Sequence, residues 1–267
     1  MADYVYKASD GELKGFADNF ASRVGDNSGP HDQDYFDMVK LLLSIKREGS
    51  LLDIGAGLGR VTKIAKDIIA ETIALEPDQQ RWQECHAACH QPPQCRVLRQ
   101  LTSEYIADNP GKTFDVIVIG MVIQHISTTA CQALFEEAAS LLKPDGVGII
   151  FTSHTVEQAR GFSYSGAAPD EVYLSQRQFN DYAENCQDQT KGIPVRRFSK
   201  AELLDCLKPY FETLYWRQVS YYREDRAAHF ENRLRLEPGT LKDTGISQFV
   251  VVQKAARGRR SADVPVR

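Results

Sequence analysis

The sequence predicts an α/β protein whose mostly parallel sheet is covered by helices on both faces. Three observations predict this fold class. Short apolar runs alternate with segments of helical periodicity between residues 32 and 153. A glycine-rich turn at residues 55–59 separates the first apolar run from a helix. The runs are apolar throughout, as in strands that right-handed βαβ crossovers bury on both faces.

The first half of this pattern contains three helices and two strands. A helix is expected over residues 32–46, which carry most of their apolar side chains on one face and follow a turn-rich break. The apolar runs 50–54 and 72–77 predict two buried strands. Each of them leads into a helical segment, at 60–70 and at 78–90.

The second half adds further strands before the alternation stops. Residues 95–100 predict a weaker third strand and residues 114–122 a strong fourth one. A helix at 128–142 and a Lys-Pro-Asp-Gly turn then lead into a fifth strand at 147–153. Residues 154–198 have little periodicity and are too long for an ordinary connection. Order resumes with a helix at 199–207 and strands at 213–219 and 247–254.

Length and composition indicate one domain in a reducing compartment. We expect a single domain over residues 1–254, with an N-terminal segment at 1–32, a substrate-cap insertion at 154–198 and a disordered tail at 255–267. A net charge of −4 and a pI of about 5.9 give no general attraction to nucleic acid or membranes. The absence of a secretory signal or membrane-length apolar run, with six scattered cysteines, predicts a cytoplasmic location.

The glycine-rich turn predicts a nucleotide site. Gly55, Gly57 and Gly59 stand at every second position, and no Gly-Lys-Ser/Thr follows them, which excludes a Walker-type phosphate loop. Asp53 precedes the turn, and a buried carboxylate there needs a partner such as a ligand ammonium. Glu76 ends the next strand, where a carboxylate can accept ribose hydroxyls. A nicotinamide dinucleotide and a tight turn without a ligand are the alternatives.

Four segments together resemble the class I S-adenosylmethionine-dependent methyltransferases. They are DIGAGLGR at 53–60, ALEP at 74–77, FDVIV at 114–118 and LLKPDG at 141–146. The resemblance covers residues 33–153 and the last two strands. It implies a Rossmann-like, seven-stranded, mostly parallel sheet with helices on both faces and a last strand that is antiparallel to its neighbours.

The resemblance also implies where S-adenosylmethionine would bind. The cofactor would lie along the carboxyl ends of the strands and contact Asp53, Gly55, Ala56, Gly57, Arg60, Glu76, Leu101, Thr102, Gly120 and Met121. In this arrangement Asp53 faces the methionine ammonium and Arg60 neutralises the carboxylate. Glu76 accepts both ribose hydroxyls. The other residues border the adenine or the methionine.

The sequence argues against nucleic acid as the methyl acceptor. Enzymes that methylate exocyclic base amines have an Asn/Asp-Pro-Pro-aromatic segment after the fourth strand, where this sequence has GMVI at 120–123. Cytosine C5 enzymes need a cysteine in the same loop, but the nearest, Cys131, lies within the predicted helix. We therefore expect a small-molecule acceptor that takes the methyl group on oxygen or nitrogen.

A protein or peptide acceptor is the alternative. The segments LDIGAGLGRVTK and DVIVIGMVIQHI also resemble protein α-N-terminal methyltransferases, including the histidine at His125. After the fifth strand the chain departs from that family, because His154 stands near the place of an Asp-Asn pair. A non-catalytic partner protein and a nicotinamide-dependent oxidoreductase are further, less favoured alternatives.

Aromatic residues and two histidines are the candidates for acceptor binding and catalysis. The aromatic set expected to line the acceptor pocket is Phe162, Tyr164, Tyr173, Tyr182 and Tyr222. A small subdomain with its own core would explain these aromatic residues equally well. His154 and His125 follow the fifth and fourth strands, and either can act as a general base near neutral pH. Position favours His154.

One cluster of cysteines and histidines has a spacing that can bind zinc. It contains Cys85, His86, Cys89, His90 and Cys95. The helix that carries most of it should lie on an outer face, away from the ligand. No metal is therefore predicted, and ordinary packing is the preferred interpretation.

Overall fold

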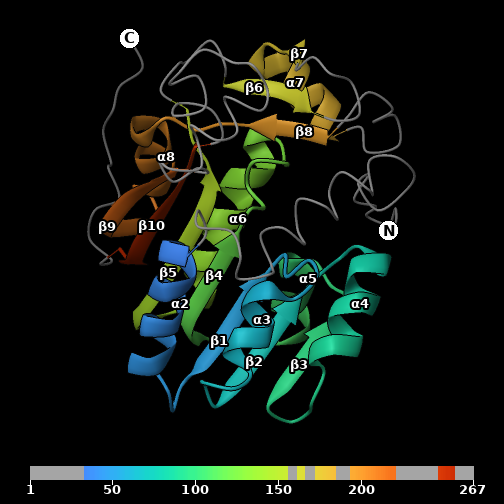
Figure 1. Ribbon diagram of the computed structural model, residues 1–267, viewed down its shortest axis with the longest axis vertical. Coiled ribbons are helices and arrows are strands. Elements are labelled where there is room, and N and C mark those ends of the chain that lie inside the picture. The colour runs from blue at the N-terminus through green and yellow to red at the C-terminus, as the bar shows by residue number, and fades with distance from the viewer. Residues whose placement is uncertain (1–32, 156–160, 166–171, 185–192, 221–245, 256–267) are drawn as a thin grey trace, which may run out of the picture.

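The computed structural model describes residues 33–155, 161–165, 172–184, 193–220 and 246–255 (Figure 1). Within these residues, seven strands form one sheet in the order β3-β2-β1-β4-β5-β10-β9. The predicted N-terminal segment 1–32, most of the predicted tail 255–267 and Tyr222 lie outside the described residues.

The strands of this sheet follow the predicted apolar runs closely. Their bounds are β1 Ser50–Ile54, β2 Glu71–Leu75, β3 Cys95–Leu98, β4 Phe114–Gly120, β5 Leu142–Ser153, β9 Phe211–Ser220 and β10 Ile246–Lys254. The first five pair with one another in parallel. β10 runs antiparallel between β5 and β9, with Ser247 opposite Ser153. The predicted Rossmann-like sheet with an antiparallel last strand is confirmed.

Helices cover both faces of the sheet. Their bounds are α2 Gln33–Ile45, α3 Arg60–Ala65, α4 Gln79–Cys89, α5 Thr102–Asp108, α6 Thr128–Leu141 and α8 Lys200–Leu207. Buried side chains of α5, α6 and α8 pack on one face, in a core that includes Phe135 and Leu203. α2 and α3 pack on the other face around Tyr35 and Val61, and α4 adjoins α3 there.

The insertion after β5 has a sheet of its own. Within the described part of the chain, β6 Phe162–Ser165 pairs in antiparallel fashion with β7 Val172–Tyr173 and with β8 Ile193–Arg196. Helix α7 Gln176–Glu184 packs against β6 and β8. We call β6, β7, α7 and β8 the cap. Figure 1 shows the cap above the upper end of α6, at the end of the molecule toward which β4 and β5 point.

The structure differs from the prediction at α5, α3 and β5. Helix α5 was not expected, and α3 ends at Ala65 rather than at residue 70. Strand β5 begins at Leu142, before the Lys-Pro-Asp-Gly turn. Phe114 pairs with Leu142 and Val116 with Val147, so the four turn residues loop out of a ladder that continues on both sides.

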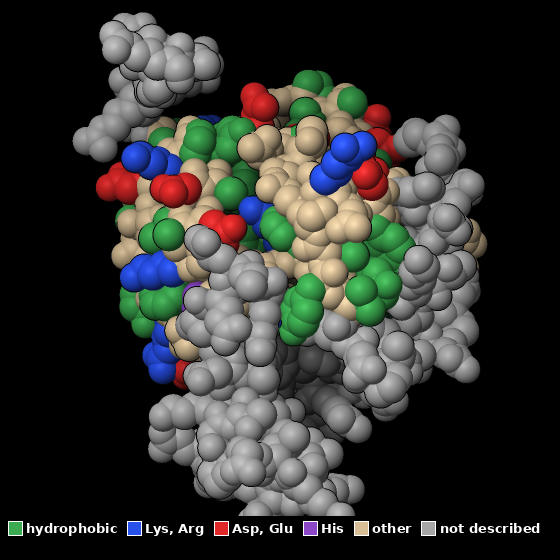
Figure 2. Space-filling model, turned by 90° about the horizontal axis from the view of Figure 1, so that it is seen from above, with side chains coloured by type: hydrophobic (Ala, Val, Ile, Leu, Met, Phe, Trp, Pro, Cys, Tyr) green, Lys and Arg blue, Asp and Glu red, His purple; other side chains and the backbone are tan. Residues whose placement is uncertain are grey.

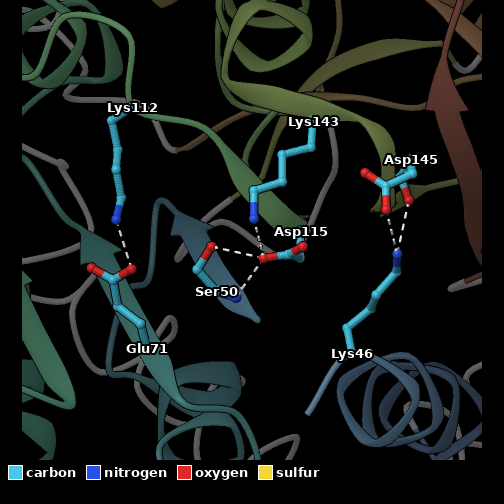
Figure 3. Close-up of polar contacts among 7 residues, drawn as sticks. All are labelled: Lys46, Ser50, Glu71, Lys112, Asp115, Lys143 and Asp145. Atoms are coloured by element: carbon cyan, nitrogen blue, oxygen red, sulfur yellow. Dashed lines mark hydrogen bonds and ion pairs between the residues drawn. The ribbon is translucent and has the colours of Figure 1, made fainter. Parts of the chain in front are cut away.

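Polar contacts tie the amino ends of the strands together (Figure 3). The carboxylate of Asp115 on β4 accepts hydrogen bonds from the Ser50 N–H (2.8 Å), the Ser50 hydroxyl (3.1 Å) and Lys143 Nζ (2.7 Å). Lys112 pairs with Glu71 at the start of β2, over 2.7 Å. Burial would raise the pKa of Asp115, but the bonds from Lys143 and Ser50 outweigh it and hold the pKa below its usual range.

None of the helices in the described ranges is long and apolar enough to cross a membrane.

Candidate active site

The glycine-rich loop between β1 and α3 folds back against the end of β2. The N–H groups of Gly55 and Ala56 both donate to the carbonyl oxygen of Leu75, over 2.9 Å and 3.0 Å. Gly57 has a φ of +57°, in the left-handed region. Among the described residues, a side-chain carbon on Gly57 would meet only Arg81, with Nη1 at 3.5 Å. The loop therefore leaves room for a ligand to approach the backbone at Gly57.

The two outer glycines of the loop pack against the protein itself. Gly59 is the N-cap of α3 with a φ of +78°, and a side-chain carbon there would lie 2.9 Å from the sulfur atoms of both Cys85 and Cys89. A side-chain carbon on Gly55 would collide with Val122. Gly57 is thus the glycine of the three whose missing side chain leaves space for a ligand.

Glu76 lies at the end of β2 and holds the middle of the glycine loop. Its side chain is 5% exposed. Oε2 accepts from the Gly57 N–H over 2.7 Å, and Oε1 accepts from the Asp78 N–H over 3.0 Å. Burial raises the pKa of Glu76 to about 7, although both hydrogen bonds and the charge of Arg81 oppose this shift. Each oxygen keeps acceptor capacity for ligand hydroxyls.

Asp53 is the second buried carboxylate at this end of the sheet. It is 3% exposed, and its Oδ2 accepts from the Thr62 hydroxyl over 2.6 Å. Burial raises its pKa to about 6, while the Thr62 bonds and the charge of Arg60 act in the opposite direction. The Arg60 guanidinium lies 5.7 Å from the centre of the Phe36 ring on α2. A ligand cation beside Asp53 would offset the cost of burying this carboxylate.

Arg81 lies beside the glycine loop and is not among the site residues predicted from the sequence. Its backbone N–H donates to Asp78, the N-cap of α4, over 2.9 Å. Its guanidinium approaches Gly57, and its charge lowers the pKa values of both Glu76 and His125. Arg81 therefore contributes positive charge between the glycine loop and the connection after β4. No motif in the sequence marks this residue.

The connection after β4 begins with a strained residue. Met121 has a φ of +59°, the one positive φ among the described residues other than glycine, and its N–H donates to the Phe151 carbonyl over 2.7 Å. Such strain persists where surrounding contacts hold it, often at functional sites. A side-chain carbon on Gly120 would lie 2.8 Å from the Tyr35 hydroxyl of α2. Gly120 and Met121 thus lie where α2 meets the ends of β4 and β5.

Leu101 and Thr102 stand at the start of α5, after β3. Leu101 is 40% exposed, and its N–H donates to the Glu104 carboxylate over 2.8 Å, whereas Thr102 is 5% exposed. An exposed leucine at the carboxyl end of a parallel strand can border an adenine ring. Leu101 and Thr102 therefore lie just after the carboxyl end of β3, and their contact with an adenine remains a prediction.

His154 follows β5 and is 6% exposed. Its Nδ1 lies 2.9 Å from the Phe198 carbonyl oxygen, and its ring meets the Trp216 ring nearly edge-on at 6.1 Å. Because a carbonyl only accepts, Nδ1 carries the proton and Nε2 is an acceptor. Burial lowers the pKa of His154, while the bond to Phe198 opposes this shift. The neutral ring has the tautomer that a base requires, but most of it is packed within the protein.

His125 is held by both of its ring nitrogens. Nδ1 lies 2.7 Å from the Pro194 carbonyl of β8, and Nε2 lies 3.2 Å from Gln124 Nε2. Burial lowers the pKa of His125 to about 4, despite the bond to Pro194. The ring is therefore neutral at physiological pH, and both nitrogens are engaged in structural contacts.

The aromatic residues of the cap pack mainly against one another. Phe162 lies 5.2 Å from the fully buried Phe179, and Tyr164 lies 5.4 Å from Tyr182, in each case between ring centres. Tyr173 is 47% exposed. Phe162 and Phe179 therefore belong to a small core of the cap itself, which was the alternative interpretation. Any contact of Tyr164, Tyr173 or Tyr182 with an acceptor remains a prediction.

The cysteine–histidine cluster contains buried cysteines and half-buried histidines. Cys85, Cys89 and Cys95 are fully buried together beside α4, and the rings of His86 and His90 stack on each other at 4.0 Å. Across the described residues, no three His, Cys, Asp or Glu side chains form a group that could hold a metal ion.

A comparison with protein families identifies the family of this chain. The family model described as a methyltransferase domain matches residues 31–208. The chain belongs to this methyltransferase family. No curated protein matches its sequence. S-adenosylmethionine is the cofactor, which decides against the nicotinamide dinucleotide.

Solved structures share the fold of this methyltransferase. The N-methyltransferase NodS from Bradyrhizobium japonicum WM9, in complex with S-adenosylhomocysteine, has a TM-score of 0.53 at 9% identity, covering 85% of this chain and 89% of that one. The 1,6-didemethyltoxoflavin-N1-methyltransferase of Burkholderia thailandensis has a TM-score of 0.52 at 16% identity, covering 92% of each chain. Magnesium protoporphyrin IX methyltransferase from Synechocystis PCC 6803 has a TM-score of 0.53 at 13% identity, covering 87% and 84%.

The residues at the glycine loop fit this cofactor. Glu76 offers acceptor oxygens for hydroxyl groups, and Asp53 offers a buried negative charge for an ammonium. Gly57 leaves room for a ligand beside its backbone. The methyltransferase thus has suitable groups for a ribose and an amino acid around the glycine loop, at the carboxyl ends of β1 and β2.

Proposed function

We propose that the protein transfers a methyl group from S-adenosylmethionine to an oxygen or nitrogen atom of a small-molecule acceptor bound beneath the cap. One observation carries this proposal. The cap is attached to the connection after β4 by two hydrogen bonds. His125 Nδ1 donates to the Pro194 carbonyl of β8, and the Arg196 N–H of β8 donates to the Gln124 carbonyl. This places the cap at the carboxyl end of the sheet, where Asp53 and Glu76 lie and where ligands of parallel sheets bind.

The chain's own residues would hold the cofactor at both ends. Glu76 accepts hydrogen bonds from the ribose hydroxyls, and Asp53 faces the methionine ammonium. Arg60 neutralises the methionine carboxylate through a charge-assisted pair. The other proposed contacts are Gly55, Ala56, Gly57, Leu101, Thr102, Gly120 and Met121. When bound, S-adenosylmethionine supplies an electrophilic methyl group on a sulfonium. The protein contributes mainly by aligning the acceptor with that group.

His154 is the proposed general base for a hydroxyl acceptor. Its Nδ1 proton is fixed on the Phe198 carbonyl, which leaves Nε2 able to take a proton. The lowered pKa keeps the ring neutral near pH 7. An amine acceptor that binds neutral would not need this step.

Methylation of a protein or peptide amine is the alternative function. The likeness at His125 to protein α-N-terminal methyltransferases favours it. Against it, both ring nitrogens of His125 are engaged by Pro194 and Gln124. We therefore prefer the small-molecule acceptor.

Nucleic acid is not proposed as a partner. Figure 2 shows the molecule from above: in the part of this face that the structure describes, acidic, basic and hydrophobic side chains are interspersed, without a broad basic area. Nucleic-acid binding depends on clustered Lys and Arg side chains. The cytoplasmic location stays a prediction from the sequence.

Transfer of label from S-adenosylmethionine tests the proposal. A cell extract is separated into small metabolites and proteins, and each fraction is incubated with the enzyme and cofactor labelled on its methyl group. Mass spectrometry should find a labelled metabolite with wild-type enzyme and none with Glu76→Ala. His86→Ala, a change on the outer part of α4, serves as the matched control. Label in the protein fraction alone would favour the alternative, and no label in either fraction would contradict both.

A further inference from the structure

The connection between β4 and α6 contacts both the glycine loop and the cap. Its residue Val122 packs directly on Gly55, where there is no room for a side-chain carbon. Three residues later, His125 Nδ1 donates to the Pro194 carbonyl of β8 over 2.7 Å. A short segment therefore joins the proposed cofactor loop to a strand of the cap.

The amide of Gln124 anchors the same segment to the core. Gln124 is 2% exposed, and its Oε1 accepts from the Thr152 hydroxyl (3.0 Å) and the Ser153 N–H (3.3 Å), at the end of β5. Its Nε2 donates to His125 Nε2 over 3.2 Å, which fixes the ring so that Nδ1 points at Pro194. The imidazole ring of His125 thus links the position of β8 to the ends of β4 and β5.

Other contacts attach the cap without the His125 ring. The Arg196 N–H donates to the Gln124 carbonyl over 2.7 Å. Asn180 Oδ1 of α7 accepts from the Thr128 N–H over 3.0 Å and from the Thr128 hydroxyl over 3.1 Å. Removing the ring should therefore leave the cap attached while loosening its position, so that a variant of His125 can fold.

We propose that His125 is a positioning residue that couples cofactor binding at the glycine loop to the position of the cap. The coupling runs from Gly55 through Val122 and His125 to Pro194. The inference rests on the proposed function, since the cap is taken to cover the acceptor. Cofactor bound against the glycine loop would restrain Val122, and the ring would pass that restraint to β8. Coupling between two sites is reciprocal, so a fixed cap would also favour cofactor binding.

Hydrogen exchange with S-adenosylhomocysteine tests the coupling without any known acceptor. In the wild type, S-adenosylhomocysteine should slow exchange of the amides of β6 and β8 by about tenfold, a common size for coupling between sites. In His125→Ala this slowing should be lost, and the dissociation constant of S-adenosylhomocysteine should rise by no more than about tenfold, because the coupling is reciprocal. His125→Asn should restore it, because its amide nitrogen can take the place of Nδ1 and donate to Pro194. His86→Ala on α4 is the matched control and should behave as the wild type.

The possible results separate this inference from the proposed function. If S-adenosylhomocysteine does not bind the wild type, the cofactor site itself is wrong. If it binds but protects β6 and β8 equally in wild type and His125→Ala, or in neither, the positioning role is overturned. Should His125→Ala fail to fold, the same comparison is made between two other variants. His125→Asn keeps the donor to Pro194, and His125→Phe keeps a ring but has no donor. Once an acceptor is identified, His125→Ala should raise its KM by about tenfold and raise the KM for S-adenosylmethionine by no more than the same factor.

Discussion

The carboxylate of Glu76 accepts a hydrogen bond from the backbone N–H of Gly57 over 2.7 Å, so the end of β2 fixes the centre of the glycine loop. The same carboxylate would accept the cofactor's ribose hydroxyls. Glu76→Ala should therefore weaken binding of S-adenosylhomocysteine by about 2–4 kcal/mol, the size of the charge-assisted hydrogen bonds lost. Calorimetry measures this change directly. Affinity within about threefold of the wild type would contradict the assignment of Glu76.

Gly57 and Gly59 should respond differently to the same substitution. A Cβ atom on Gly57 would meet only Arg81 among the described residues, so Gly57→Val should fold, at a strain cost of about 1–2 kcal/mol, and lose cofactor binding. Gly59→Val would drive its side chain against Cys85 and Cys89 and should destabilise the protein further. Thermal unfolding and calorimetry with S-adenosylhomocysteine separate the two effects. A Gly57→Val protein that still binds would show that the ligand does not approach this backbone.

Cofactor affinity should fall as the pH is lowered through the pKa values of the two buried carboxylates. Burial raises the pKa of Asp53 to about 6 and that of Glu76 to about 7 in the protein without ligand. A ligand ammonium and ribose hydroxyls both favour the ionised carboxylates, so binding is strongest where both are deprotonated, above pH 7. The dissociation constant of S-adenosylhomocysteine should rise between about pH 8 and about pH 5.5. Asp53→Asn should flatten the lower part of this profile, and a wild-type affinity independent of pH would contradict the prediction.

The sequence predicted the sheet more fully than the parts around it. Strands such as Phe114–Gly120 are buried on both faces, so an apolar run marks them without any other information. Helix Thr102–Asp108 was missed because it is short and its N-cap is Leu101, which has no capping side chain. The start of β5 was missed because the Lys-Pro-Asp-Gly turn interrupts the ladder without ending the strand. The second error comes from a local turn signal that pairing with β4 overrides.

The candidate site was predictable where a backbone requirement or a buried charge marks the sequence. Gly57 and the carboxylates Asp53 and Glu76 belong to this class. Arg81 could not be found, because an arginine on an amphipathic helix gives no indication that the fold turns it toward the glycine loop. The engagement of His125 by Pro194 depends on residues that are 69 positions apart, which no local pattern encodes.

The ion pair at the amino end of the sheet should contribute modest, pH-dependent stability. Lys143→Met removes the 2.7 Å bond to Asp115, whose side chain is 13% exposed, and should cost about 1 kcal/mol at pH 7. The pKa of Asp115 is held below its usual range, so this stabilisation is present above the unfolded pKa and is lost as the pH falls through the folded one. Urea unfolding at pH 7 and at about pH 3 should show the difference between variant and wild type becoming smaller in acid.

A second lysine in the same region provides the control for this measurement (Figure 3). Lys46 pairs with Asp145 over 3.3 Å, but the Asp145 side chain is 77% exposed. Lys46→Met should therefore change the free energy of unfolding by less than about 0.5 kcal/mol. Equal losses in the two variants would mean that the partial burial of Asp115 adds nothing.

His154→Asn separates a catalytic from a structural role of this histidine. The amide nitrogen of asparagine can donate to the Phe198 carbonyl as Nδ1 does, but nothing in the variant replaces the acceptor nitrogen Nε2. If His154 is the base for a hydroxyl acceptor, the single-turnover rate of methyl transfer should fall about 10²–10⁴-fold, with S-adenosylhomocysteine affinity within about threefold of wild type. The wild-type rate should also rise with pH and become constant at a pH below the usual range of histidine pKa values, because burial lowers the pKa of His154. The variant should lack this rise of the rate with pH. A variant that keeps both the rate and the profile would show that His154 serves only to hold Phe198 and Trp216 in place. Transfer would then proceed by alignment alone, as it does for an amine that binds neutral, and the acceptor would be nitrogen.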